Sequence, residues 1–109
     1  MTSVFIHQPE YFPWTHFFEK LYKSDIVVLL DSVQYSRRSF QNRNIVFSET
    51  GTKWITVPII KSPRETKIND IKINNKIEWQ ELHRDILTKL YSDNIYFDEI
   101  NNLFKKVFE

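Results

Sequence analysis

Three short segments of the chain gather polar and aromatic side chains that could bind or transform a small molecule. They are HQPEYFPW at His7–Trp14, DSVQYS at Asp31–Ser36 and QNRN at Gln41–Asn44. The first contains an imidazole, which can accept a proton near neutral pH and act as a general base. The third contains amide and guanidinium donors, which suit phosphates, carboxylates or sugar hydroxyls. The residue types therefore indicate a polar small-molecule site.

The elements between these segments predict how the segments could meet. Ser3–His7 is a short apolar run typical of a strand, and Ile26–Leu30 is a continuous aliphatic run typical of a strand buried on both faces. Between them, Pro13–Lys23 has apolar residues at helical spacing and a proline suited to the first helical turn. This order predicts a βαβ unit with parallel strands. His7, Gln8, Asp31 and Gln34 would then follow the carboxyl ends of neighbouring strands, where open α/β sheets bind ligands.

The rest of the chain predicts a hairpin followed by helices. Strands are expected at Asn44–Phe47 and Lys53–Ile60, joined by a turn at Glu49–Gly51. In the second strand, the alternation predicts that Ile55, Val57 and Ile59 share one face. A further short strand is expected around INDIKI, which ends at Ile73.

Two helices are expected at the carboxyl end, over Ile77–Leu90 and Ile95–Phe108. The expected apolar face of the first is formed by Trp79, Leu82, Ile86 and Leu90. The aromatic load of the second predicts an exposed apolar patch around Phe97, Leu103, Phe104 and Phe108. Such a patch would be covered by a homo-oligomer or by a missing carboxyl-terminal partner. The fold class is α/β: a small, partly parallel sheet that opens with a βαβ unit, a β-hairpin and two C-terminal helices. It is expected to form a single domain, residues 1–109.

Composition excludes several classes of function. Of 109 residues, 41% are hydrophobic and 16% aromatic, so the chain should fold. The formal net charge of +1, from 15 basic and 14 acidic residues, does not suggest nucleic-acid binding. The absence of cysteine excludes disulfides and thiolate metal sites, and a single glycine excludes glycine-rich phosphate loops. Neither a signal peptide nor a membrane span is expected, so the expected location is cytoplasmic.

Each candidate residue also has a structural interpretation. His7 could be a satisfied histidine at a strand end, Asp31 a turn cap, and Arg37 part of a solvated pair with Arg38. The run Gln41–Asn44 is harder to explain structurally, because asparagine is disfavoured in helices and strands alike.

The chain resembles the WbqC-like protein family. The resemblance rests on IHQPEYFPW, FFEKLYKSDIVVLLDSVQYSRRSFQNRN and KWITVPI, in this order, and is dense from Val4 to Ile60. Two departures are visible: His16 stands where the family often has glycine, and members generally run to about twice this length. The chain is therefore expected to be the amino-terminal half of a longer WbqC-like protein.

The resemblance implies a role in the biosynthesis of bacterial surface polysaccharide, such as O-antigen or capsule, with transfer of glycine or another acyl group to the amine of an amino sugar. His7 could then act as general base and Asp31 could orient it or bind the sugar. Arg43 or Asn42 could stabilise the oxyanion, and Arg43 and Arg37 could bind the diphosphate of a nucleotide sugar. The predicted binding residues are Gln8, Tyr11, Trp14, Gln34, Tyr35, Arg37, Gln41, Asn42, Arg43 and Asn44. No cofactor and no metal is expected.

Two alternatives stay open at the level of the sequence. His7 in a loop and His16 in a helix are loosely similar to nucleotidyltransferases that bind nucleotides with two histidines, although the close histidine spacing of those enzymes is absent. The second alternative is a non-catalytic binding or scaffold module. An activity assay separates the enzymes from the binding module.

Overall fold

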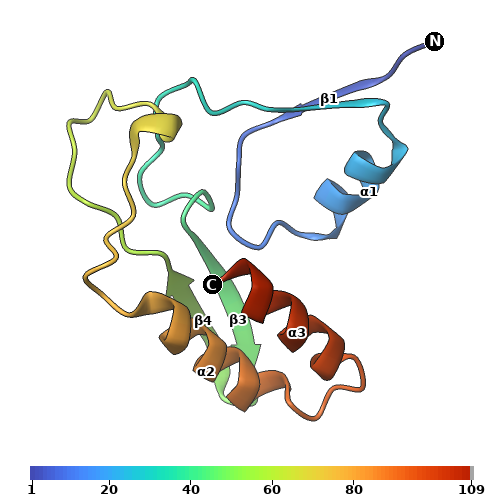
Figure 1. Cartoon of the computed structure of the whole chain (residues 1–109), viewed down its shortest axis with the longest axis vertical. Coiled ribbons are helices and arrows are strands. Elements are labelled where there is room, and N and C mark those ends of the chain that lie inside the picture. The colour runs from blue at the N-terminus through green and yellow to red at the C-terminus, as the bar shows by residue number, and fades with distance from the viewer. Residues whose placement is uncertain (109) are drawn as a thin grey trace. The chain divides into compact units, whose positions relative to one another are not determined.

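The computed structural model of this chain describes residues 1–108 and contains both helices and strands (Figure 1). In chain order the elements are β1 (Val4–His7), α1 (Thr15–Lys23), β2 (Ile26–Leu29), β3 (Arg43–Ser48), β4 (Gly51–Thr56), the 3-10 helix η1 (Ile68–Asp70), α2 (Trp79–Tyr91) and α3 (Phe97–Val107). The predicted fold class is confirmed: a parallel strand pair, a hairpin and two carboxyl-terminal helices are all present. The chain divides into two compact units. The first comprises residues 1–44 and 56–74, and the second comprises 45–55 and the residues from 75 onward.

The predicted βαβ opening is confirmed. β1 and β2 pair in parallel, with Val4 opposite Ile26 and His7 opposite Leu29. At their carboxyl ends, the Leu30 amide donates to the His7 carbonyl at 2.8 Å. The helix begins two residues later than expected, because Trp14 adopts an extended conformation and is the N-cap residue.

The amino ends of β1 and β2 are joined by a carboxylate. Asp25 Oδ2 accepts hydrogen bonds from the Ser3 amide at 2.8 Å and from the Ser3 hydroxyl at 3.1 Å. The Ser3 carbonyl in turn accepts from the Asp25 amide at 3.2 Å. The bonds from Ser3 stabilise the charged form, so they hold the pKa of the Asp25 carboxyl below its usual range.

We therefore expect Asp25 to make folding sensitive to acid. The pKa of Asp25 is lower in the folded state than in the unfolded chain. Its contribution to the stability of the fold is therefore complete above the unfolded pKa of about 4, and it is lost as pH falls through the folded pKa. Asp25→Asn should lower the melting temperature at pH 7, and the difference from the parent should shrink as pH falls toward about 2. Asp93→Asn, at an exposed carboxylate of the second unit, is the matched control. A difference independent of pH would contradict this role.

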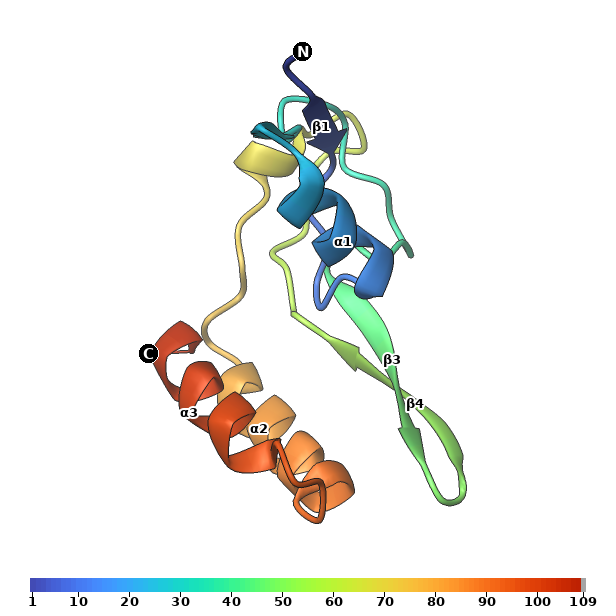
Figure 2. The ribbon, with the colours of Figure 1, turned by 90° about the vertical axis from the view of Figure 1, so that its right-hand side faces the viewer.

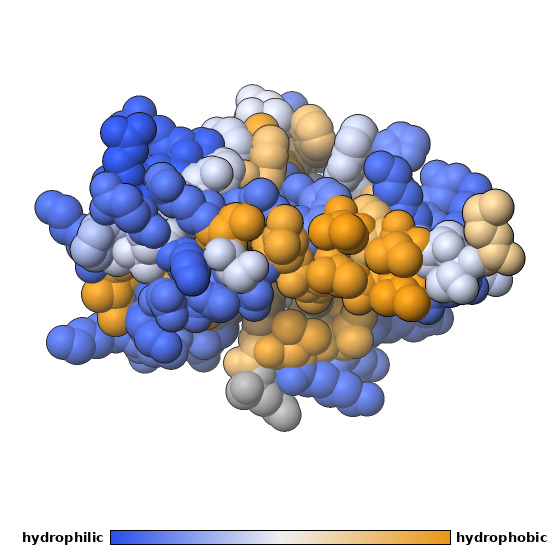
Figure 3. Space-filling view, turned by 90° about the horizontal axis from the view of Figure 1, so that it is seen from above, coloured by the Kyte–Doolittle hydropathy of each residue, from blue (hydrophilic) through white to orange (hydrophobic). Residues whose placement is uncertain are grey.

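The prediction that β2 is buried on both faces was wrong. Its four residues are 36% to 54% exposed, and Figure 3 shows a continuous apolar patch along the strand pair. Phe5 on β1 is buried, where it packs against the Phe17 ring at 5.5 Å, but the described part of the chain provides no second layer over β2. A continuous aliphatic run indicates a strand that needs cover on both sides. The run alone does not indicate which part of a protein packs on each face of the strand.

The first helix also differs from expectation, since none of its residues is buried. Phe18 and Leu21 are exposed, and Tyr22 is almost fully exposed. Its helical periodicity was correctly predicted, but the apolar face that this periodicity defines is not buried. Phe17 packs against Phe5 and His7 on β1, whereas much of the rest of the apolar face of α1 meets solvent.

The hairpin is confirmed with shifted ends. β3 and β4 pair around a turn at Glu49 and Thr50, and Gly51, the first residue of β4, has φ of +133°, a conformation that other residues rarely adopt. β4 ends at Thr56, earlier than predicted, and the following Pro58 cannot donate a ladder hydrogen bond. The expected strand near Ile73 is reduced to an isolated antiparallel bridge with Ile59.

In the second unit, α2 and α3 lie side by side (Figures 1 and 2). The buried residues of α2 are Trp79, His83 and Leu87, at spacings of four. The buried face of α2 therefore differs from the predicted one: Leu82 is exposed, and His83, with 2% exposure, takes a core position. The Tyr91 hydroxyl accepts a hydrogen bond from the Phe47 amide at 3.0 Å, which ties α2 to the hairpin.

The patch expected on α3 is partly present. Leu103 is exposed together with Ile100 and Val107, whereas Phe97 is buried. Phe108 contacts the Trp79 ring at 5.6 Å, so the aromatic residues of this helix turn toward α2 instead of solvent. Within the described residues, no helix is long and apolar enough to cross a membrane.

Candidate functional site

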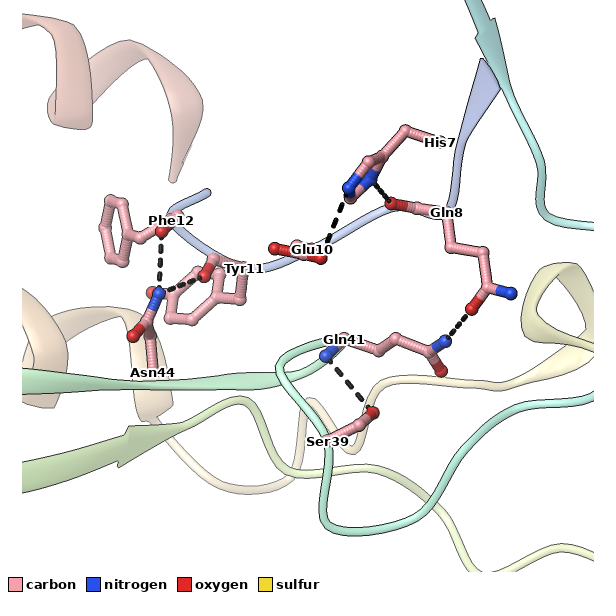
Figure 4. A network of polar contacts seen from close by, with 8 residues as sticks. All are labelled: His7, Gln8, Glu10, Tyr11, Phe12, Ser39, Gln41 and Asn44. Atoms are coloured by element: carbon pink, nitrogen blue, oxygen red, sulfur yellow. Dashed lines mark hydrogen bonds and ion pairs between the residues drawn. The ribbon is translucent and has the colours of Figure 1, made fainter. Parts of the chain in front are cut away.

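The imidazole of His7 is held at the carboxyl end of β1 (Figure 4). Its Nδ1 lies 2.6 Å from the Gln8 carbonyl oxygen, and its ring packs edge-on against Phe17 at 5.2 Å. A carbonyl oxygen only accepts hydrogen bonds, so Nδ1 carries the proton in the neutral ring. Nε2 is then the nitrogen that can take up a proton.

The carboxylate beside His7 is Glu10, with Oε1 3.6 Å from Nε2. Glu10 belongs to the polar segment after β1 but was not among the predicted site residues. The available signal was its position three residues after His7 in a short loop. A protonated His7 would form an ion pair with Glu10.

Asp31 was predicted to orient His7 or to bind the sugar. It lies in the segment after β2, is exposed, and its described contact is made by the backbone: its carbonyl accepts from the Asn69 amide at 2.9 Å. Within residues 1–108, no hydrogen bond or ion pair of its carboxylate is described. The catalytic role of Asp31 stays a prediction, and the parallel neighbouring strands on which it relied are confirmed.

Gln41 connects the loop after β1 to the loop after β2. Its Nε2 donates to Gln8 Oε1 at 2.5 Å, and its Oε1 accepts from the Ser36 amide at 3.0 Å. Its own amide donates to the Ser39 hydroxyl at 3.4 Å (Figure 4). The two predicted polar segments are therefore hydrogen-bonded to each other through one side chain.

The next residue, Asn42, joins a buried tyrosine to the chain beyond the hairpin. Its Oδ1 accepts from the Tyr35 hydroxyl at 2.8 Å, and its Nδ2 donates to the Val57 carbonyl at 3.0 Å. The Asn42 carbonyl also accepts from the Val57 amide at 2.7 Å. Burial raises the pKa of Tyr35, against the opposing charges of Arg43 and Arg37, so the hydroxyl stays a donor at neutral pH.

Arg43 and Asn44 each hold the carbonyl of a residue with an unusual backbone. Phe12 and Arg38 have φ of +49° and +56°, in the left-handed region that costs a side-chain-bearing residue about 1 kcal/mol or more. Arg43 Nη2 donates to the Arg38 carbonyl at 2.7 Å, and Asn44 Nδ2 donates to the Phe12 carbonyl at 2.7 Å. Asn44 also reaches the Tyr11 carbonyl at 3.1 Å.

We call the side chains of Gln41, Asn42, Arg43 and Asn44 the clasp. No structural role was predicted for this polar run, yet each of the four side chains forms a hydrogen bond to a loop residue. Arg43 is tied to the Arg38 backbone carbonyl, and its role in binding a ligand stays a prediction. The partners are backbone groups distant in the sequence, so the pattern alone could not identify them.

The predicted aromatic binding residues lie in different surroundings. Tyr11 is half-buried, its ring contacts that of Phe12 at 4.4 Å, and burial raises its pKa well above the usual range. Trp14 is 66% exposed and packs edge-on against His16 at 4.8 Å. His16 in turn faces Glu19 at 3.5 Å, and no described contact joins it to His7. The pair of histidines expected for a nucleotidyltransferase is not formed by these contacts.

The loop after β2 lines a pocket of about 440 Å³. Its wall contains the predicted residues Gln34, Tyr35 and Arg37, and also Ser36 and Arg64. Arg64 was not predicted, because a single arginine in a charged loop carries no distinguishing pattern. Among the described residues, no group of three or more His, Asp or Glu side chains is placed to hold a metal ion.

Comparison with known proteins assigns the chain to a protein family. The chain matches the model of the WbqC-like protein family over residues 8–109. It is 34% identical over 101 residues to the uncharacterized protein Rv1507c of Mycobacterium tuberculosis, an alignment that covers 92% of this chain and 43% of that protein. No solved structure matches the chain. The chain belongs to the WbqC-like protein family, and it spans less than half the length of the curated relative it matches.

Proposed function

We propose that this chain carries the His7 site of an enzyme of bacterial surface-polysaccharide biosynthesis, which transfers glycine or another acyl group to the amine of an amino sugar. Membership of the WbqC-like family supports the biological setting. The single observation that carries the chemistry is the hydrogen bond from His7 Nδ1 to the Gln8 carbonyl at 2.6 Å. It leaves Nε2 as the proton acceptor, as a general base requires.

The proposed reaction needs an activated acyl donor, which we take to be an acyl ester or thioester. The amine nitrogen attacks the acyl carbon and forms the C–N bond. His7 Nε2 removes the amine proton, and the C–O or C–S bond to the donor breaks as that proton passes to the leaving oxygen or sulfur. Glu10, 3.6 Å from Nε2, stabilises the imidazolium that exists between these proton transfers.

Direct detection of the product tests this function. The purified protein is incubated with a nucleotide-linked amino sugar and a glycyl thioester, and the sugar is analysed by mass spectrometry. The expected result is a sugar that has gained one glycyl unit through an amide. The same sugar with its amine already acetylated is the control and should not react. Binding of the sugar without any acylated product, across several acyl donors, would instead support the non-catalytic binding module.

A further inference from the structure

The pocket beside the clasp has walls that are fixed by hydrogen bonds. The Tyr35 amide donates to the Thr66 carbonyl at 2.9 Å, and Gln34 forms an isolated antiparallel bridge with Lys67. The Pro63 carbonyl accepts from both the amide and the hydroxyl of Thr66, at 3.1 and 2.7 Å. These bonds close a turn that presents Arg64. The two loops are therefore held side by side before any ligand arrives.

Positive charge is concentrated in these loops. Residues 34–44 and 61–67 contain six of the chain's 15 basic residues but one of its 14 acidic residues. The basic residues are Arg37, Arg38, Arg43, Lys61, Arg64 and Lys67, and the acidic one is Glu65. The whole chain has a formal charge of only +1, so this local excess favours an anionic ligand.

Two guanidinium groups line the same pocket and keep donors for a ligand. Arg37 Nη2 donates to the Ser62 carbonyl at 3.0 Å, which fixes the side chain and uses one of its five N–H donors. For Arg64, no hydrogen bond or ion pair is described within residues 1–108. The lining residues include no carboxylate that could neutralise either group. A pair of planar N–H forks matches the oxygens of a phosphate or diphosphate.

We propose that Arg37 and Arg64 bind a diphosphate group in this pocket. The inference deepens the proposed function and rests on it for one point, that the diphosphate belongs to the sugar substrate. Gln41 joins the pocket to the catalytic end of the site, because it accepts from the Ser36 amide in the pocket wall and donates to Gln8, beside His7. A sugar attached to a diphosphate in the pocket would extend along this connection.

Titration calorimetry with pyrophosphate, uridine diphosphate and uridine tests the site. Both diphosphates should bind to the parent protein. Arg64→Gln should weaken both at least about tenfold, the usual effect of losing a charged hydrogen bond. Lys61→Gln removes the same charge from the same loop but does not line the pocket, so we expect less than about a threefold change. Melting temperatures of both variants verify that they fold.

Uridine carries no phosphate and should not bind, and the two diphosphates distinguish the sources of the diphosphate. Tighter binding of uridine diphosphate than of pyrophosphate supports a nucleotide-linked substrate. Equal binding of the two supports the diphosphate alone as the recognised group, as a lipid-linked sugar would also present. No binding of either at millimolar concentration, or equal effects of Arg64→Gln and Lys61→Gln, overturns the proposal. The measurement needs no acyl transfer, so a diphosphate site that persists in a protein without transferase activity refutes the proposed function and leaves this inference standing.

Discussion

Replacing His7 with glutamine is expected to lower the rate of acyl transfer by about 10²–10⁴-fold, the usual contribution of a general base. The glutamine amide can still donate a hydrogen bond to the Gln8 carbonyl, which His7 Nδ1 contacts at 2.6 Å in the parent protein. It cannot accept a proton from an attacking amine. The turnover number should therefore fall much more than the Michaelis constant rises, which initial rates over a range of sugar concentrations would reveal.

Two further variants sharpen this test. His16→Gln changes an exposed histidine on α1 that lies against Trp14 and Glu19, so its rate should match the parent. Glu10→Gln removes the carboxylate near Nε2 but retains the base, so a smaller loss than that of His7→Gln is expected. Full activity in a folded His7→Gln variant would remove His7 from the mechanism and with it the main support for the proposed reaction.

The βαβ opening could be predicted because its information is local. The aliphatic run Ile26–Leu30 and the helical spacing in Pro13–Lys23 each specify an element, and short connections between parallel strands leave few topologies. The burial of β2 could not be predicted in the same way. Burial depends on which layers cover a strand, and in the described chain β1 is the only strand that pairs with β2.

The candidate site shows the same division between local and distant information. His7 was identified from its residue type and its place after a strand. Asp31 follows the neighbouring strand, and its role beside His7 stays a prediction, whereas Glu10, three residues along the chain, lies 3.6 Å from Nε2. Similarly, Arg43 was predicted as a site residue because it lies in a very polar run, whereas Arg64 was not predicted. The two arginines differ in their hydrogen bonds to the backbone: Arg43 donates to the Arg38 carbonyl, and no such bond is described for Arg64.

Truncating Asn42 is expected to be the most destabilising change within the clasp. Its side chain satisfies the Tyr35 hydroxyl and the Val57 carbonyl, and Tyr35 is buried. A buried polar group left without a partner costs about 1–3 kcal/mol, so Asn42→Ala should lower the free energy of unfolding by about 2 kcal/mol or more. For a chain of this size that corresponds to a fall of roughly 8 °C or more in melting temperature. Asn102→Ala, at an exposed position on α3, is the matched control and should be neutral or slightly stabilising, because alanine favours helix.

A double-mutant cycle with Tyr35→Phe isolates the contribution of the hydrogen bond from the loss of packing. Tyr35→Phe removes the hydroxyl that Asn42 Oδ1 accepts from, at 2.8 Å, and keeps the ring in place. Asn42→Ala leaves the Tyr35 hydroxyl without its acceptor, and Tyr35→Phe leaves Asn42 Oδ1 without its donor. The double variant has neither group. The combined loss in free energy of unfolding should therefore be smaller than the two single losses added together, by about 0.5–3 kcal/mol. Simple additivity in chemical denaturation would mean that Asn42 does not stabilise the loops through Tyr35, and the clasp would then depend on its bonds to backbone carbonyls alone.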